Sequence, residues 1–489
     1  MMSGISLTKA LKKYEGMPLQ VKASLWFLIC MVLQKGMSVL TTPIFTRLLG
    51  SANYGQFGLY SSWENIISVF ITLRLTANFY TQGLVQFEHD REEFSSAVLG
   101  FSTTFMGSYF VVYWLFRDFF NNLFSLTTTQ MTAMFIILWT DMVFTYWLCE
   151  QRVDYKYQML VGISLLVAVV KPIVGIIAVL THEDQVTARI VSIALVNLIF
   201  YTPFLIPKLR SGQSLFKGWL WKYALVYSLP LVPHYLSQIV LSRADTIMIG
   251  EMIGSDEAGI YTLSYSLGTL LLIINNALLQ TMTPWMYRKI REKQIDDIKG
   301  VAYISLIAIS ILNLLLVIFA PEIIAVFAPP TFRDAIWVIP PIAISGVMVF
   351  SYDLFATYEF YHVRTFFITV GSIIGACLNI VLNYLLIPHF GFIAAGYTTL
   401  ICYICYALCH YFLMKRVCRE KHPGQVPYEG RKLLIMYSVL MVTTFIIMLT
   451  YEHFALRMIC LAVFAVLLII FHKRIIAGLK RLANLKKTS

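Results

Sequence analysis

The sequence predicts an all-α polytopic membrane protein of about 14 transmembrane helices, built as two repeated six-helix lobes with two further helices at the C-terminal end. Three observations support this prediction. Apolar residues make up 58% of the 489 residues and charged residues only 13%, about half the charge of an average soluble protein. Apolar runs of about 20 residues, long enough to cross the hydrocarbon core as a helix, recur throughout. Finally, one stretch of the first half recurs in the second.

The repeat joins two helix–turn–helix stretches that lie 204 residues apart, at Gly50 and Gly254. The other aligned pairs are Ser51 with Ser255, Gly55 with Gly259 and Phe57 with Tyr261. A second, weaker match at an offset of 207 pairs His182 with His389 and Ala188 with Ala395. This period is far too long for a solenoid. It indicates two copies of one helical bundle, as in many transporters.

The apolar runs are expected to be helices, because backbone groups in lipid must form their hydrogen bonds within their own segment. No outer-membrane barrel has such long uninterrupted apolar runs. The expected spans are 23–44, 57–78, 96–116, 129–149, 158–180, 190–207, 223–248, 258–280, 300–320, 335–355, 366–387, 392–414, 433–450 and 458–472.

The distribution of Lys and Arg predicts which side each loop faces. Of 38 such residues, four lie in spans (Lys35, Arg74, Lys171, Arg243) and five in alternate loops (Arg47, Arg117, Arg189, Arg333, Arg457), which leaves 29 for the other loops and both termini. Positive charge marks the cytoplasmic side of a membrane protein. Both termini are therefore expected in the cytoplasm, and the net charge of +12 indicates topology rather than nucleic-acid binding.

Seven parts follow from these spans. They are a cytoplasmic amphipathic N-terminus at 1–22, an N-lobe at 23–207, a cytoplasmic linker at 208–222, a C-lobe at 223–414, a cytoplasmic loop at 415–432, two further spans within 433–472 and a basic cytoplasmic tail at 473–489. The run at 5–16 is expected to lie at the membrane interface as a short helix. Spans 13 and 14 fall outside the six-plus-six repeat.

Nothing in the sequence indicates an enzyme. The loops are short, whereas a membrane glycosyltransferase or polymerase needs a sizeable loop or domain to form an active site. Phosphate-binding, zinc-protease and nucleophile-elbow motifs are absent. We expect no cofactor and no metal. Cys402, Cys405 and Cys409 share a helix face and are more consistent with packing than with a metal site.

The ionisable residues inside the predicted spans are the candidate functional residues. They comprise the four cations Lys35, Arg74, Lys171 and Arg243 and the four acids Glu64, Asp141, Asp245 and Asp353. Each charge near mid-bilayer costs about 2.5–3.5 kcal/mol, so such groups face a cavity or a partner. Because the numbers are equal, mutual neutralisation across helices is one interpretation. Arg74 and Asp353 lie near cytoplasmic ends and can reach the interface.

Lys35 and Lys171 lie too deep in their spans to reach the interface easily, which favours a watery cavity that accepts an anion. Arg243 and Asp245 are two residues apart, so on a helix they point about 200° from each other. Either residue can reach the outer interface, or Asp245 can carry a coupling proton or cation, as buried carboxylates do in secondary transporters. Glu64 and Asp141 are further candidates for coupling to H⁺ or Na⁺.

Four stretches together resemble the lipid-linked oligosaccharide (O-antigen) flippases of bacterial surface polysaccharide pathways, the Wzx type of the multidrug/oligosaccharidyl-lipid/polysaccharide (MOP) exporter superfamily. The stretches are SVLTTPIFTRLLGSANYGQFGLYSS, SLPLVPHYLSQIVLSRADTIMIGEMIGSDEAGIYTLSYSLG, FAPPTFRDAIWVIPPIAIS and LNIVLNYLLIPHFGFIAAGYTTLICY. They lie between residues 38 and 403 and are specific as an ordered set.

The resemblance implies a MATE-like fold of two six-helix lobes around a cavity that opens alternately to each side. It implies an undecaprenyl-diphosphate-linked glycan as substrate, flipped across the bacterial inner membrane, with membrane lipid around it and a polysaccharide polymerase and chain-length regulator as partners. The cations Lys35, Lys171, Arg243 and Arg74 would offset the diphosphate charge. The two extra spans resemble those of fourteen-span members.

Two other functions stay open from the sequence. An ion-coupled multidrug antiporter on the same fold would be favoured by a net negative cavity, whereas the deep lysines favour an anionic substrate. A polysaccharide polymerase or ligase would be favoured by a long outer loop, which the expected spans do not leave room for.

Overall fold

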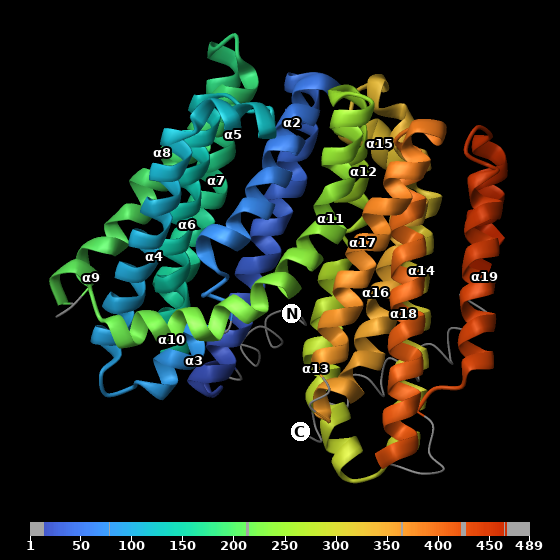
Figure 1. The fold of residues 1–489 in the computed structure, drawn as a ribbon. Helices are drawn as coiled ribbons and strands as arrows, with labels where there is room; N and C mark the ends of the chain where they lie inside the picture. The colour runs from blue at the N-terminus through green and yellow to red at the C-terminus, as the bar shows by residue number, and fades with distance from the viewer. Residues whose placement is uncertain are drawn as a thin grey trace, which may run out of the picture. The chain divides into compact units, whose positions relative to one another are not determined.

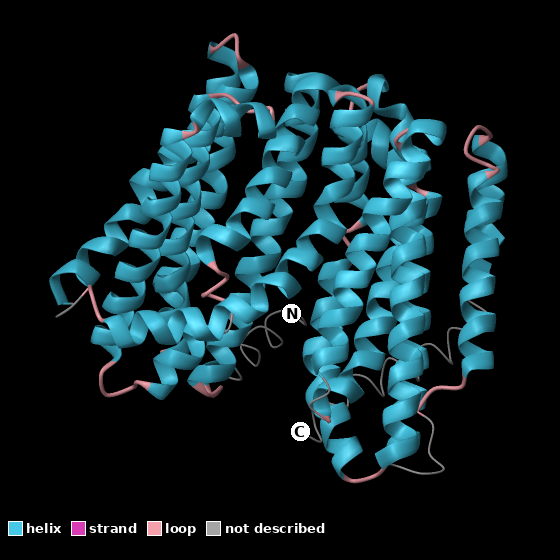
Figure 2. Cartoon of the chain, viewed as in Figure 1, coloured by secondary structure: helices cyan, strands magenta, loops and turns pink. Residues whose placement is uncertain are grey.

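The computed structural model describes residues 14–77, 79–211, 215–362, 365–421, 427–463 and 465–466, and helices are the regular elements of this part of the chain (Figures 1 and 2). Twelve described helical segments are long and apolar enough to cross a membrane. The expected number of about 14 agrees roughly with this. Two predicted spans are joined in α2 (Leu19–Thr72), and span 14 is described only to residue 466.

Most of the predicted N-terminal helix at 5–16 and the whole basic tail at 473–489 lie outside the described residues. The chain forms two compact units, which divide between Leu236 and Ser237.

Among the described residues, unit 1 begins with α2, continues through eight further helices and the 3₁₀ turn η1, and ends with the 3₁₀ turn η2 (Leu229–Leu231) and the first residues of α11 (Val232–Met252). The elements between α2 and η2 are α3 (Phe79–Gln86), α4 (Arg91–Leu115), α5 (Arg117–Phe124), α6 (Thr128–Val153), α7 (Tyr157–Thr181), α8 (Gln185–Tyr201), η1 (Thr202–Phe204), α9 (Leu205–Ser211) and α10 (Gly218–Ser228). The main apolar core lies among α2, α4, α6 and α8, where Tyr60, Met134 and Ile190 are at most 1% exposed. α7 packs against α2 and α8.

Unit 2 begins inside the helix that follows η2 (Leu229–Leu231). Its elements are α11 (Val232–Met252), α12 (Ser255–Gly268), α13 (Leu272–Arg291), α14 (Ile295–Ile318), α15 (Ala320–Phe327), η3 (Pro330–Trp337), α16 (Ile339–Tyr361), α17 (Thr365–Phe390), α18 (Ile393–Lys421) and α19 (Gly430–Met448). α16 is central, since it packs against α12, α13, α14, α17 and α18. α19, red in Figure 1, packs against α14 and α16, and an apolar helix follows at Phe454–Val463.

Each copy of the sequence repeat has a glycine at its helix break. Gly50 interrupts α2 with φ 68° and ψ −179°. Gly254 separates α11 from α12 with φ 158° and ψ 170°. Both dihedral pairs lie in a region that glycine alone adopts readily, because a Cβ atom would clash with the backbone. The alignment of Gly50 with Gly254 therefore reflects one shared backbone requirement.

Several predicted boundaries are wrong by a few residues. Span 2 was expected to continue to residue 78, but α2 ends at Thr72 because Leu73 and Arg74 adopt left-handed backbone angles (φ 49° and 50°). Span 6 was expected to start at 190, but α8 starts at Gln185 because the Asp184 carboxylate accepts the Thr187 N–H and caps the helix. The predicted spans 223–248 and 258–280 are also interrupted, the first by η2 and the second by residues 269–271.

A polar cluster ties together the predicted cytoplasmic ends of α3, α4, α6 and α9. Glu150, 7% exposed, accepts hydrogen bonds from Tyr80 (2.5 Å) and Ser95 (3.0 Å) and pairs with Lys208 (2.5 Å). Beside it, Arg91 pairs with Asp154 at 2.5 Å.

Asp154 follows the last residue of α6 and is held in its charged form. Burial raises the pKa of Asp154, but hydrogen bonds and charge from Arg91 and Lys156 outweigh this and leave the pKa below its ordinary value. The ends of these helices are thus fixed by charges that lie at the predicted membrane surface, where they are not buried in hydrocarbon.

We expect Gly50→Ala to destabilise the protein through local backbone strain alone, because beyond the adjoining residues of its own helix a Cβ atom at this position would meet no atom within 4 Å. The expected loss in the free energy of unfolding is about 1–3 kcal/mol, measured by thermal melting in detergent. Gly162→Ala is the matched control. Gly162 lies in α7 with equally open space around it, so alanine there should be neutral or slightly stabilising. Equal melting of the two variants would contradict the strain argument.

Candidate functional site

A pocket of about 250 Å³ opens between α2, α7 and α8 of unit 1. Its lining residues are Gln34, Met37, Ser38, Thr41, Phe45, Ala168, Lys171, Pro172, Gly175, Arg189 and Ile193. Two of these side chains are cationic. The pocket therefore combines apolar walls with two positive charges inside a bundle of membrane-spanning helices.

Lys171 reaches this pocket from the middle of α7, next to Pro172, which removes one backbone donor from the helix. Its ammonium lies 5.1 Å from the centre of the Tyr201 ring, within range of a cation–π interaction. Asp141 on α6 acts on Lys171 through its charge. Lys171 makes no ion pair shorter than 4 Å with any described residue, so Asp141 offsets its charge only partly.

Arg189 supplies the second cation from the second turn of α8. Its guanidinium lies 3.9 Å from the ring centre of Phe45 and 3.6 Å from that of Phe57. The Nη1 atom is buried and donates no hydrogen bond to any described residue. Arginine stacks well on aromatic rings and presents a planar fork of donors that matches phosphate. This side chain is thus held rigidly with part of its hydrogen-bonding capacity unused.

Two acidic residues of unit 1 lie near the Tyr60 hydroxyl, and one of them, Asp141, also interacts with Lys171 through its charge. Asn197 donates a hydrogen bond to Asp141 at 3.0 Å, and Glu64 and Asp141 are both within electrostatic range of the Tyr60 hydroxyl. The Tyr60 hydroxyl and the Asn197 Oδ1 are buried without a hydrogen-bond partner among the described residues. Asp141 therefore lies within electrostatic range of Lys171 and, like Glu64, of Tyr60. Lys171, Asp141 and Glu64 are three of the seven residues expected to form the site.

In unit 2 the central feature is a buried carboxylate with neutral donors around it. Asp245 on α11 is 0% exposed. Its Oδ1 accepts a hydrogen bond from Asn383 of α17 at 2.6 Å, and its Oδ2 accepts one from Thr399 of α18 at 2.5 Å and another from Tyr261 of α12. Asn379 extends the network, since its Oδ1 accepts from Asn383 at 3.4 Å.

The oxygen atoms of this network are a suitable set for a proton or a hard cation. Carboxylate, amide and hydroxyl oxygens are the ligands that hard cations prefer. The structure gives Asp245 no ion pair with a Lys, Arg or His among the described residues, whereas a charge in such a place normally has a partner.

The other predicted cations lie elsewhere. Lys35 is exposed on α2 and does not line the pocket, although its neighbour Gln34 does. Arg74 is half-buried in the turn after α2 rather than in a span. Arg243, half-buried on α11, interacts electrostatically with Tyr265. Lys171, Lys35 and Arg74 belong to unit 1 and Arg243 to unit 2.

Sequence reasoning missed several of these residues. Arg189 was expected in an outer loop. The Asp184 capping signal could have moved the start of the helix to residue 185 and placed Arg189 inside the bundle. Asn379 and Asn383 are four residues apart, which puts both on one helix face, and this polar pair in an apolar helix was a usable signal. Glu359 and His410 form a buried pair, with Oε1 and Nδ1 2.8 Å apart. No sequence signal indicated that these two residues would meet.

Comparisons with known proteins identify the family. The model of the family described as Polysaccharide biosynthesis protein matches residues 21–290, more than half of the chain. Lsg locus putative protein 1 of Haemophilus influenzae is 24% identical over 206 residues, which are 41% of this chain and 51% of that protein. The alignment thus spans about half the length of this relative.

Solved structures show the fold. The lipid II flippase MurJ in an inward closed conformation superposes with a TM-score of 0.65 and 13% identity, over 93% of this chain and 100% of MurJ. An inward-facing multidrug resistance MATE transporter of the MOP superfamily superposes with a TM-score of 0.53 and 13% identity, over 84% of this chain and 97% of the transporter. The Vibrio cholerae MATE transporter VcmN in its bent form superposes with a TM-score of 0.53 and 11% identity, over 82% of this chain and 97% of VcmN.

The expected MATE-like helical fold is therefore confirmed, as is the family resemblance drawn from the four sequence stretches. The chain belongs to the polysaccharide biosynthesis protein family and has the fold of the MOP superfamily.

Proposed function

We propose that this protein is a flippase that moves undecaprenyl-diphosphate-linked oligosaccharide repeat units across the bacterial inner membrane, for O-antigen, capsule or exopolysaccharide synthesis. The lobes at 23–207 and 223–414 alternate access to the two sides, with both termini in the cytoplasm. Family membership supports a role in polysaccharide biosynthesis, and the MurJ-like fold is compatible with lipid-linked substrates. A polymerase and a chain-length regulator are the proposed partners, because a flipped repeat unit must then be joined into a chain.

The observation that carries this proposal is the cationic pocket of unit 1. A diphosphate brings negative charge into a region where each isolated charge costs several kcal/mol. Arg189 and Lys171 supply positive charge there, and the guanidinium of Arg189 has a buried donor without a partner. Charge-assisted hydrogen bonds from such a donor to phosphate are strong and geometrically selective. Lys35, Arg74 and Arg243 are proposed to meet the diphosphate at other stages of the cycle.

Asp245 is proposed as the site of ion coupling, with Glu64 and Asp141 as further candidates. A carboxylate with 0% exposure and only neutral donors binds a proton or Na⁺ favourably, because either ion removes the cost of the isolated charge. Ion binding at Asp245 would alter how α11 packs against α17 and α18, which can bias one conformation of the lobe.

An ion-coupled multidrug antiporter is the alternative, and the half-buried carboxylate of Asp141 and the buried one of Asp245 favour it. The two functions differ in the charge of the substrate. An organic cation would be repelled by Arg189 and Lys171, whereas a diphosphate would be attracted by them. We favour the flippase for that reason.

Deletion of the gene in its bacterial host tests the proposal directly. Lipid-linked repeat units should accumulate in the inner leaflet, and the wild-type gene should restore their export. An intact surface glycan without such accumulation would overturn the flippase and make drug-efflux assays the next step.

Arg189→Gln and Lys171→Gln should each reduce rescue of the deletion strain, by roughly tenfold in export of repeat units, because each removes a charged contact with phosphate worth about 1.5–3 kcal/mol. Lys35→Ala tests in the same way the exposed cation of α2, which lies outside the pocket. Arg117→Gln is the matched control, since Arg117 is exposed and pairs with Asp118 at the surface. Protein levels in the membrane must be equal. Full export of repeat units by both pocket variants would show that the cationic pocket does not support the flippase proposal.

Asp245→Asn should abolish the effect of the coupling ion while leaving the bundle folded. The wild-type protein should melt at a higher temperature as Na⁺ or proton concentration rises, because an ion that binds only the folded state stabilises it. The variant should lose this dependence together with ion-driven export. Asp353→Asn, which removes a membrane carboxyl group outside the network, is the control for the Na⁺ dependence. Unchanged ion dependence in Asp245→Asn would exclude Asp245 as the coupling site.

A further inference from the structure

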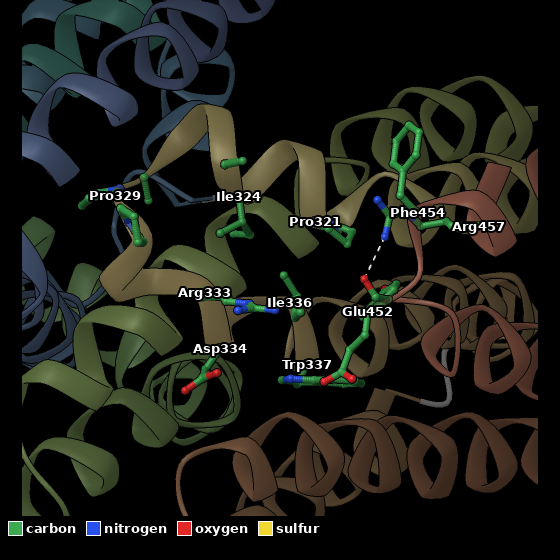
Figure 3. Close-up of a pocket in the computed structure, with 14 residues that line it drawn as sticks. Pro321, Ile324, Pro329, Arg333, Asp334, Ile336, Trp337, Glu452, Phe454 and Arg457 are labelled. Carbon is green, nitrogen blue, oxygen red and sulfur yellow. Dashed lines mark hydrogen bonds between the residues drawn. The ribbon is translucent and has the colours of Figure 1, made fainter.

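A second, larger pocket of about 590 Å³ lies in unit 2 and has a different chemical character (Figure 3). It is enclosed by α15, η3 and the turn between α19 and the helix at Phe454–Val463. The predicted topology puts these segments on the outer side of the membrane. Its size falls in the range of about 300–1,000 Å³ that is typical of ligand sites.

The walls of the pocket are fixed by internal contacts. Arg457, 4% exposed, donates from Nη1 to the carbonyl of Tyr451 at 3.0 Å and from Nη2 to the Glu322 carboxylate. The Tyr451 hydroxyl donates to the carbonyl of Val317 at 2.8 Å. These bonds fasten the turn after α19 to α14 and α15. The pocket is therefore already formed without a ligand.

Aromatic and polar side chains both line this pocket. The indole ring of Trp337 is half-buried, with its centre 5.4 Å from that of Tyr451. Arg333, Asp334 and Glu452 are exposed and line the same pocket (Figure 3), and the structure gives them no hydrogen bond or ion pair with other described residues. The Nε of Arg457 is buried and likewise has no partner among them.

This combination suits a sugar better than a phosphate or a lipid tail. The face of a sugar ring carries C–H groups that pack against an aromatic ring, and its hydroxyl groups donate to carboxylates and accept from guanidinium groups. Two carboxylates (Asp334, Glu452) and two cations (Arg333, Arg457) line the pocket, and Arg457 is already paired with Glu322. An anion therefore finds no net attraction here. The pocket thus lacks the positive charge that characterises the pocket of unit 1.

We propose that this outer pocket binds sugar units of the glycan during or after its passage across the membrane. The inference rests on the proposed flippase function and adds a substrate contact to it. It also assigns a role to the C-terminal helices beyond the repeat, because Tyr451, Glu452, Phe454 and Arg457 supply one wall.

The test uses the full chain in lipid nanodiscs and the repeat-unit oligosaccharide of the host, released from its carrier by mild acid. Binding is titrated with the wild type, Trp337→Leu and the double variant Asp334→Asn with Glu452→Gln. We expect roughly tenfold weaker binding in each, since a ring or a hydrogen-bonding pair central to a site contributes at this scale. Trp114→Leu is the control, because Trp114 is an exposed tryptophan outside the pocket. Inorganic pyrophosphate should not compete.

Wild-type affinity in both pocket variants, no binding by the wild type, or competition by pyrophosphate would each overturn the sugar site. The double variant changes only exposed side chains, so it remains informative if Trp337→Leu fails to fold. Binding requires no transport, which separates this proposal from the flippase itself. If lipid-linked units accumulate in the deletion strain but the pocket variants bind the oligosaccharide normally, the flippase proposal stands and only the sugar-site proposal is overturned.

Discussion

The free energy needed to place a charge in hydrocarbon is the constraint on which the organisation of this chain depends. It confines most charged residues to loops and termini, and each charged residue that lies within a membrane helix must face a cavity or a polar partner. In unit 1 the cavity is a pocket, where Arg189 is held between two aromatic rings and Lys171 lies over a third. In unit 2 the polar partner is a shell of hydroxyl and amide donors around Asp245.

The two repeats use corresponding helices for opposite charges. The first part of α2, with α7 and α8, corresponds to α11, α17 and α18 through the offsets of 204 and 207 residues. Thr41, which lines the cationic pocket, aligns with Asp245, and Ser192 aligns with Thr399. One packing arrangement thus holds cations in one unit and a carboxylate in the other. Such a division fits a transporter in which one lobe contacts an anionic substrate and the other senses an ion.

The glycines at the two helix breaks show how the repeat keeps this arrangement. Gly50 and Gly254 both adopt backbone angles that other residues avoid, and each sets the direction of the helix that follows. Beyond the repeat, the turn after α19 is fastened to α14 and α15 by Arg457 and Tyr451. The added helices therefore attach to unit 2 through α14, α15 and α16.

The sequence by itself determined the helical membrane class, the repeat, the approximate spans and the family resemblance, because these follow from the local apolar pattern and from glycines with a specific backbone role. It also identified Lys171, Asp141, Glu64 and Asp245 as ionisable groups in spans. Only the tertiary structure decided which of these residues meet. Arg189 and Lys171 line one pocket, and Arg189 stacks on Phe45 and Phe57 of α2. Asn383 and Thr399 meet Asp245. The contacts of Arg189 with α2 and of Asp245 with α17 and α18 join residues more than 100 positions apart, and no local pattern records such pairings.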